Sequence, residues 1–262
     1  MIRDIRKTAL DFGREQSVTR LEYTSGYDGQ SDWALLGGDL SSTMWIVFIH
    51  GHGSTADQIY TWPELRDTWL PAIKKQGAGI VSVYLRGNAW MSPAAACDLH
   101  DVLAYLREHY PVRTFVFLSG SMGGTSNLIY AALHPEDVAA VVALGAAVDL
   151  TKYYTWCREQ PGPAVLTEIA DAISRSYGGE PQEIPHIYNH HSALIHSDKL
   201  TMPVFFVHGQ ADAIMPFDQA RLLRDKMSDV DSFRFQAIAD GDHDSPLPYA
   251  AEGLEWVLRS LT

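Results

Sequence analysis

Eight short apolar runs, each bounded by polar or small residues, recur along the chain and predict β-strands. They are LEYTS near residue 21, DWALLG near 32, MWIVFIH from 44, GIVSVYL from 79, RTFVFLS from 113, VAAVVALG from 138, PVFFVHG from 203 and SFRFQAI from 232. Segments with helical spacing of apolar residues separate the later runs, at 62–76, 93–110, 125–134, 216–227 and 249–261. This alternation predicts an α/β fold: a mostly parallel, eight-stranded sheet with helices on both faces. The first two runs have no helix between them and predict an antiparallel hairpin at the sheet edge.

The regular alternation is interrupted between the run that ends near residue 145 and the run that begins at 203. This interval is rich in aromatic residues and histidine and contains the helical segment AVLTEIADAISRSY. Long insertions within a compact domain are more often functional than accidental. We therefore expect one domain over residues 1–262, with a small cap at about 150–200 above the carboxyl end of the sheet. A surface excursion whose aromatic side chains pack on the core is the alternative.

Composition narrows the possible partners of the chain. The 262 residues are 46% hydrophobic and carry a net charge of -12. Nucleic acid is not an expected partner, because phosphate binding needs a basic surface. A membrane is not expected either, since no apolar stretch approaches the ~20 residues that span a bilayer. The first 16 residues mix charges of both signs with apolar positions, unlike a signal peptide, so the expected location is cytoplasmic.

The segment FVFLSGSMGG (115–124) is the pattern most suggestive of chemistry. An apolar strand ends in small residues around Ser121, and a segment of helical character follows directly. Such a strand-to-helix turn exposes a serine hydroxyl, although Ser119 stands where glycine is usual in Gly-x-Ser-x-Gly. On these ten residues alone, an ordinary glycine-rich loop explains the pattern equally well.

Loops after two later strands supply an acid, Asp212, and a histidine, His243. The carboxyl ends of parallel strands meet at one edge of a sheet, so these residues are expected near Ser121. The chain order Ser, Asp, His is that of α/β-hydrolases and differs from chymotrypsin-type and subtilisin-type proteases. We therefore assign Ser121 as nucleophile, His243 as base and Asp212 as the carboxylate that orients the base. Asp149, which follows another strand, is the second candidate for the acid.

Two backbone amides are candidates to stabilise the oxyanion that forms when a serine attacks an acyl group. One belongs to Met122, which follows the nucleophile, and the other to His52 in the loop HGHG at 50–53. The side chain of His52 is not needed for this role. His50 and His52 could also begin an H-x-H metal site, but the following residues do not complete such a motif, and we expect no metal or cofactor.

The motifs HGHG, SGSMGG, YNHHSAL, KLTMPVFFVHGQADAIMPFDQA and GDHD together resemble the α/β-hydrolase superfamily from about residue 20 to the end. PVFFVHGQADAIMP and RGNAW are similar to the catalytic domains of the prolyl-oligopeptidase and acylaminoacyl-peptidase group and to related esterases. The resemblance implies the triad Ser121, Asp212 and His243. Peptidases of that group usually carry a propeller domain before the catalytic domain, and we expect this chain to lack it, because only about forty residues precede the third predicted strand.

The sequence therefore predicts a serine carboxylic-ester hydrolase that acts on small-molecule esters. An aminopeptidase or amidase of the prolyl-oligopeptidase-like group is the alternative. Four aromatic residues near the presumed site could form the substrate pocket or a platform for a sugar ring: Trp90, Tyr153, Tyr154 and Trp156. This pocket would suit acetyl or hydroxycinnamoyl esters of carbohydrates. The same residues could equally be the core of the cap.

Overall fold

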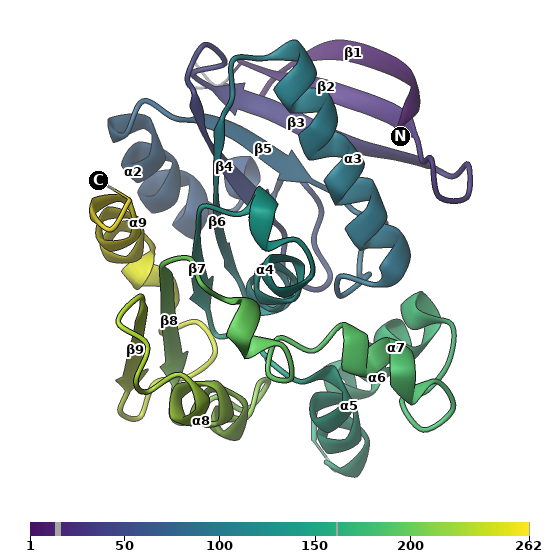
Figure 1. Cartoon of the computed structure of the whole chain (residues 1–262), viewed down its shortest axis with the longest axis vertical. Helices are drawn as coiled ribbons and strands as arrows, with labels where there is room; N and C mark the ends of the chain where they lie inside the picture. Colours follow the sequence, from purple (N-terminus) through teal and green to yellow (C-terminus); the bar gives the residue numbers. More distant parts are fainter. Residues whose placement is uncertain (14–16, 161, 262) are drawn as a thin grey trace.

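The computed structural model describes residues 1–13, 17–160 and 162–261, which form one sheet flanked by helices (Figure 1). The strands are β1 (Arg3–Asp11), β2 (Ser17–Thr24), β3 (Ser31–Gly38), β4 (Met44–Ile49), β5 (Gly79–Val83), β6 (Thr114–Gly120), β7 (Ala140–Leu144), β8 (Val204–Gly209) and β9 (Phe233–Ile238). Their order across the sheet is β1-β2-β3-β5-β4-β6-β7-β8-β9. Strands β4 to β9 run parallel, and β1, β2 and β3 extend the sheet antiparallel.

The predicted count of eight strands is wrong by one, since the described residues contain nine. All eight predicted strands form, and the additional strand is β1 at the sheet edge. Its sequence, RDIRKTALD, has no apolar run, and most of its residues are exposed. An edge strand pairs on one side only and can keep polar side chains in water, so its hydrophobic pattern is weak. The predicted hairpin, β2–β3, is antiparallel as expected but lies one strand inside the edge.

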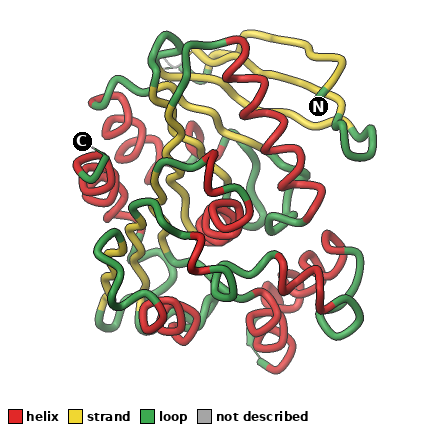
Figure 2. The backbone as a smooth tube through the Cα atoms, in the orientation of Figure 1, coloured by secondary structure: helices red, strands yellow, loops and turns green. Residues whose placement is uncertain are grey.

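Helices cover both faces of the sheet (Figure 2). One face carries α3 (Pro93–His109), α4 (Ser121–Leu133) and α8 (Phe217–Lys226), and the other carries α1 (Gln58–Thr61), α2 (Leu70–Lys75) and α9 (Ala250–Arg259). The π-helix η1 (Leu65–Trp69) precedes α2, and short 3-10 helices follow α4 (η2, Pro135–Asp137) and precede β8 and α9 (η3, Ser197–Lys199; η4, Leu247–Tyr249). Strand β4 is buried on both sides because Trp45, Val47 and Ile49 face one core and Ile46 and Phe48 the other.

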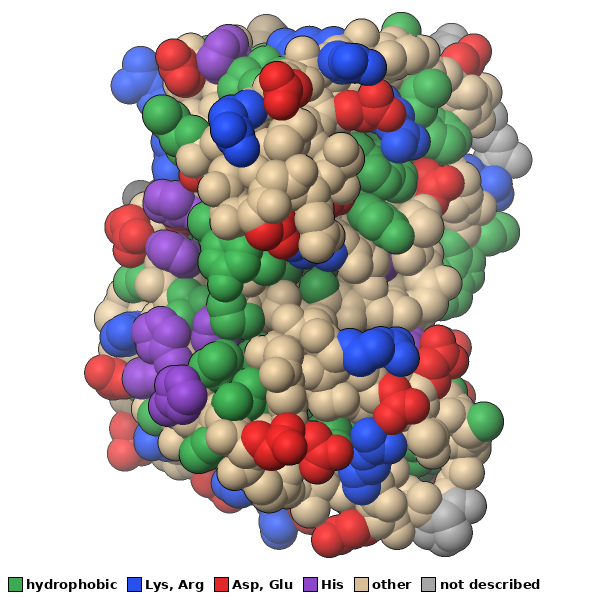
Figure 3. All heavy atoms as spheres, turned by 90° about the vertical axis from the view of Figure 1, so that its right-hand side faces the viewer, with side chains coloured by type: hydrophobic (Ala, Val, Ile, Leu, Met, Phe, Trp, Pro, Cys, Tyr) green, Lys and Arg blue, Asp and Glu red, His purple; other side chains and the backbone are tan. Residues whose placement is uncertain are grey.

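The interval between β7 and β8 contains α5 (Leu150–Glu159), α6 (Ala164–Tyr177) and α7 (Pro185–His190). Helices α5 and α6 pack on each other, and the apolar face of α6 carries Leu166, Ile169 and Ile173 inward. This helical group lies beside the carboxyl ends of the strands (Figure 1). No helix in the described ranges is long and apolar enough to cross a membrane. On the face drawn in Figure 3, basic side chains are interspersed with acidic ones.

Candidate active site

Ser121 stands at the junction of β6 and α4, in a backbone conformation that side chains rarely adopt. Its φ is +56°, in the left-handed region. The residues around it are small because there is no space for larger ones: a Cβ added to Gly123 would lie 2.0 Å from the carbonyl oxygen of Ile49. The tight turn thus lifts the Ser121 hydroxyl above the end of β6 while α4 packs closely against β4.

Ser119 occupies the place of the usual glycine without a strained backbone, since its φ is not positive. Its side chain is fully buried, and the N–H of Ile49 donates a hydrogen bond to Ser119 Oγ over 2.9 Å. The pairing of β4 with β6 ends at Val47, so the buried N–H of Ile49 has no backbone acceptor on β6. The Ser119 hydroxyl provides the missing acceptor. The departure from Gly-x-Ser-x-Gly therefore has a structural reason.

His243 lies between Ser121 and Asp212. Its Nδ1 is 2.7 Å from Asp212 Oδ2, and its Nε2 is 2.9 Å from Ser121 Oγ. In the tautomer of the neutral imidazole that fits these partners, Nδ1–H donates to the carboxylate and Nε2 accepts from the serine hydroxyl. This is the arrangement in which an imidazole can remove the proton of an attacking serine.

The Asp212 carboxylate is fully buried and held from two sides. Its Oδ1 accepts hydrogen bonds from the backbone N–H groups of Ile214 and Met215, each over 2.8 Å.

Asp149, the second candidate for the acid, has another function: its side chain caps the N-terminus of α5 by accepting from Lys152 N–H. His208 Nε2 lies 3.5 Å from Asp212 Oδ2, but it donates to the Met215 carbonyl, and burial lowers the pKa of His208.

The two amides expected to face an oxyanion belong to Met122, next to the nucleophile, and to His52, which lines the same cavity as Ser121. Met122 is in the first turn of α4, where backbone N–H groups have no acceptor within the helix. The N–H of His52 forms no hydrogen bond within the described residues. The loop that carries it is fixed because Gln58 Oε1 accepts from Gly51 N–H and both ring nitrogens of His50 lie within hydrogen-bond distance of backbone carbonyl oxygens.

A cavity of about 230 Å³ opens beside Ser121 and His243. Its walls are largely apolar and come from the HGHG loop, the segment 58–69, helix α6 and the loop after β9; they include Phe48, Leu65, Trp69, Val165, Ile169, Ile214 and Leu247. Trp62 and Asp244 also line it, and both are exposed. A larger cavity of about 800 Å³, lined by Arg86, Asn88 and Arg175 among others, does not include the serine, so its size alone does not make it the reactive site.

The four aromatic residues predicted as a substrate pocket, all within the described part of the chain, are not among the residues that line this cavity. Trp90, Tyr153 and Tyr154 are buried, and Trp156 is partly buried against the core. Trp90 and Tyr153 instead support the cavity walls. Trp90 Nε1–H donates to His52 Nδ1 over 3.2 Å, and Tyr153 O–H donates to the carbonyl of Ile214 over 3.0 Å.

The sequence interpretation missed two features of this site. Because the indole nitrogen only donates, the bond from Trp90 leaves the His52 proton on Nε2, 3.6 Å from Glu168 Oε1 on α6. The His52 side chain thus lies between the Trp90 indole and Glu168, and its buried Nε2–H is beyond hydrogen-bond distance of the carboxylate. Trp62 was also missed, since it belongs to a short segment whose position depends on tertiary packing. Its sequence signal was a tryptophan ten residues after His52, too weak to assign a role.

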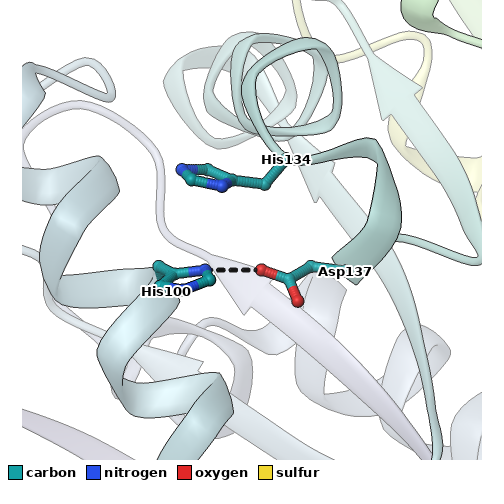
Figure 4. Close-up of side chains that lie close together, drawn as sticks. All are labelled: His100, His134 and Asp137. Carbon is teal, nitrogen blue, oxygen red and sulfur yellow. Dashed lines mark hydrogen bonds and ion pairs between the residues drawn. The ribbon is translucent and has the colours of Figure 1, made fainter. Parts of the chain in front are cut away.

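His100, His134 and Asp137 lie close enough together to suggest a metal site (Figure 4). Asp137 is already occupied by protein donors: its Oδ2 accepts from Tyr130 O–H and lies 2.8 Å from His100 Nδ1, and its Oδ1 pairs with Arg107. The two imidazole rings are stacked, with an interplanar angle of 23°, so their lone pairs do not converge on one point. The cluster is therefore explained as a hydrogen-bond network between α3 and the end of α4.

Comparisons with known proteins agree with the fold. Residues 45–161 match the family model for the alpha/beta hydrolase fold. The structure is similar to fluorophosphonate-binding serine hydrolase F of Staphylococcus aureus (TM-score 0.68, 14% identity, 93% of this chain and 98% of that one). It is also similar to an S-formylglutathione hydrolase from Agrobacterium tumefaciens (TM-score 0.68, 14% identity, 99% of this chain and 100% of that one). A third similar structure is an acetyl xylan esterase from Paenibacillus sp. R4 (TM-score 0.70, 13% identity, 98% of this chain and 88% of that one). No curated protein matches the chain in sequence. The predicted α/β-hydrolase fold is confirmed.

Proposed function

We propose that the protein is a serine hydrolase that cleaves small carboxylic esters through an acyl-enzyme. The observation that carries this proposal is the position of His243, within 2.9 Å of Ser121 Oγ and 2.7 Å of Asp212 Oδ2. A hydroxyl alone is a weak nucleophile at neutral pH, and this pair of hydrogen bonds is what makes it reactive. The proposal is also supported by the strained backbone at Ser121, because such strain persists where a function needs it.

In the first half of the reaction, Ser121 Oγ attacks the ester carbonyl carbon and His243 Nε2 takes the serine proton. The carbonyl oxygen becomes an oxyanion, and we assign the N–H groups of His52 and Met122 as the donors that bind it; each such donor contributes roughly 3 to 4 kcal/mol. The bond between carbon and the alcohol oxygen then breaks, and His243 returns the proton to the departing alcohol. Asp212 stabilises the imidazolium throughout.

In the second half, a water molecule takes the place of the alcohol. His243 accepts a proton from this water as it attacks the acyl-enzyme, and the collapse of the second oxyanion returns the proton to Ser121 and releases the carboxylic acid. The cavity of about 230 Å³ is smaller than those that enclose drug-sized ligands, so it favours a short acyl group.

A Ser121→Ala variant tests the proposal. It should reduce p-nitrophenyl acetate hydrolysis by about 10⁴-fold or more and abolish labelling by a fluorophosphonate probe. Unchanged hydrolysis in this variant would contradict the proposal. Turnover of aminoacyl anilides faster than that of matched esters would instead favour an aminopeptidase or amidase.

A further inference from the structure

Trp62 is a large aromatic side chain that the protein leaves 41% exposed at the cavity that contains Ser121. Within the described residues, its ring stacks on no other aromatic ring and lies beneath no Lys or Arg side chain. Neighbouring Trp69 is buried, stacks edge-on against Phe48, and donates to the Leu247 carbonyl. Trp69 is therefore part of the wall, whereas one face of Trp62 is available to a ligand.

Two polar side chains lie in the same cavity with hydrogen-bonding groups to spare. Asp244 is exposed, and its carboxylate forms no hydrogen bond or ion pair in the described part of the chain. Gln58 is buried, and its Oε1 is used by Gly51 N–H while its NH₂ group has no acceptor among the described residues. Gln58 and Trp62 are four residues apart, and the Trp62 N–H donates to the Gln58 carbonyl, so one helical turn places them on the same side.

The cavity therefore has two chemically different parts. Its inner wall consists of buried apolar side chains such as Phe48 and Leu65, to which the buried Gln58 adds an amide donor, and its rim offers an aromatic face and a carboxylate acceptor. A polyhydroxylated ring matches all three groups at once: its C–H face packs on an indole, and its hydroxyls both donate to a carboxylate and accept from an amide. A purely apolar alcohol would use neither Asp244 nor Gln58.

The lining of the cavity separates the roles of the two parts. The buried apolar wall beside Ser121 suits a short acyl group, whereas Trp62 and Asp244 are exposed lining residues of the same cavity. The alcohol portion must therefore extend to the rim, where Trp62 and Asp244 lie. From this arrangement we infer that Trp62, Asp244 and Gln58 form a subsite for a sugar ring, and that the substrates are short-chain acyl esters of carbohydrates. The inference rests on the proposed ester hydrolase activity.

The test compares three acetyl esters on each variant: mono-O-acetylated methyl xylosides, cyclohexyl acetate and acetylcholine. Cyclohexyl acetate has a ring of the same size without hydroxyls, so the ratio of kcat/KM for the xylosides to that for cyclohexyl acetate reports hydroxyl recognition. Any loss of active protein cancels in this ratio.

The wild-type ratio should exceed 1, and Asp244→Asn should lower it about tenfold, because hydrogen bonds to a charged partner are strong. Trp62→Ala should raise KM for both ring substrates, by about tenfold for the xylosides, and Trp62→Phe should restore most of that loss.

Ile195→Ala is the matched control, because Ile195 is an equally exposed apolar residue (44%) that does not line the cavity, and its ratio should equal that of the wild type. A wild-type ratio at or below 1, or a KM for the xylosides unaffected by Trp62→Ala, would overturn the inference. So would a preference for acetylcholine that Asp244→Asn removes, since the rim would then bind a cation. Ser121→Ala distinguishes a failure of the sugar subsite from a failure of the proposed esterase activity. If Ser121→Ala abolishes hydrolysis while the kcat/KM ratios of the Trp62 and Asp244 variants equal that of the wild type, only the sugar subsite is refuted.

Discussion

At the scale of single residues, Asp212 and Asp149 show how environment decides the function of a carboxylate. Both follow a strand end, and the sequence leaves either as the partner of His243. Asp212 is fully buried, accepts two backbone N–H bonds on Oδ1 and presents Oδ2 to His243. Asp149 accepts from Lys152 N–H at the start of α5. Only the first arrangement fixes the tautomer of an imidazole and offsets its developing charge.

An amide replacement at each position tests this difference. Asp212→Asn should lower kcat by about 10³ to 10⁴-fold, because an amide can donate to Nδ1 and so stabilise the wrong tautomer. Asp149→Asn should leave hydrolysis near the wild-type rate and the free energy of unfolding nearly unchanged, since asparagine is as good an N-cap as aspartate. Steady-state kinetics and urea unfolding of both variants provide the comparison. A larger kinetic effect at Asp149 would reverse the assignment of the acid.

At the scale of elements, the close contact between α4 and β4 holds the nucleophile turn in place. The contact depends on Gly123, where an added Cβ would overlap the backbone carbonyl of Ile49, and a backbone atom cannot move aside as a side chain can. Ser119 reinforces the same contact through its hydrogen bond from Ile49 N–H. The position of Ser121 Oγ is thus set by packing between two elements as much as by its own φ.

Gly123→Ala should therefore separate α4 from β4 and displace the nucleophile. Gly178→Ala is the matched control: this glycine ends α6 with φ +85°, and an added Cβ would meet no atom within 4 Å. The control should lose about 1 to 2 kcal/mol of unfolding free energy from backbone strain alone and retain hydrolysis. Gly123→Ala should lose more stability and nearly all hydrolysis. Equal thermal stability and equal rates in the two variants would show that the contact with Ile49 is unimportant.

The sequence identified every strand that carries an apolar run. In β4 and β6 the run is continuous because helices cover both faces, and the partly buried β9 was found as well. Ser121 follows β6, Asp212 follows β8 and His243 follows β9, so the ends of these strands predicted the three residues near one another. The edge strand β1 had no such run and was missed. Trp62 was missed because its place in the cavity depends on contacts between separate segments, which no local pattern encodes. Trp90 and Tyr153 were chosen for the pocket by their type, but their side chains are buried behind its wall.

At the scale of the whole molecule, the helices between β7 and β8 are joined to the rest of the fold by a buried histidine. His191 Nδ1 is 2.9 Å from the Met91 carbonyl oxygen, in the loop that precedes α3, and its ring lies edge-on against Tyr177 of α6. The protonated form is disfavoured at this position: burial is the main cause, and it lowers the pKa of His191 to about 4. Neutral His191 therefore holds the inserted helices against the sheet domain.

This depressed pKa makes stability depend on pH. Unfolded His191 titrates near its ordinary pKa of ~6.5, so between pH 6.5 and 4 the unfolded chain binds more protons than the folded one, and the free energy of unfolding falls as the pH falls. At pH 5 this loss is about 2 kcal/mol, and above pH 6.5 it is absent. His191→Asn retains a donor for the Met91 carbonyl but cannot titrate. Its unfolding free energy should accordingly decrease by about 2 kcal/mol less than that of the wild type between pH 7 and pH 5.

Urea unfolding at the two pH values measures this difference, with His186→Asn as the control because His186 is exposed on the same segment. Buried Asp32 acts in the opposite direction: its pKa is raised to about 6, chiefly by burial, so its contribution to stability increases as the pH falls. Asp32 is present in all three proteins and cancels when each variant is compared with the wild type. If His191→Asn and His186→Asn show the same pH dependence, the acid sensitivity does not arise at the contact between His191 and Met91, and other contacts, such as the hydrogen bonds of Tyr177 O–H to the Trp90 and Met91 carbonyls, hold the inserted helices.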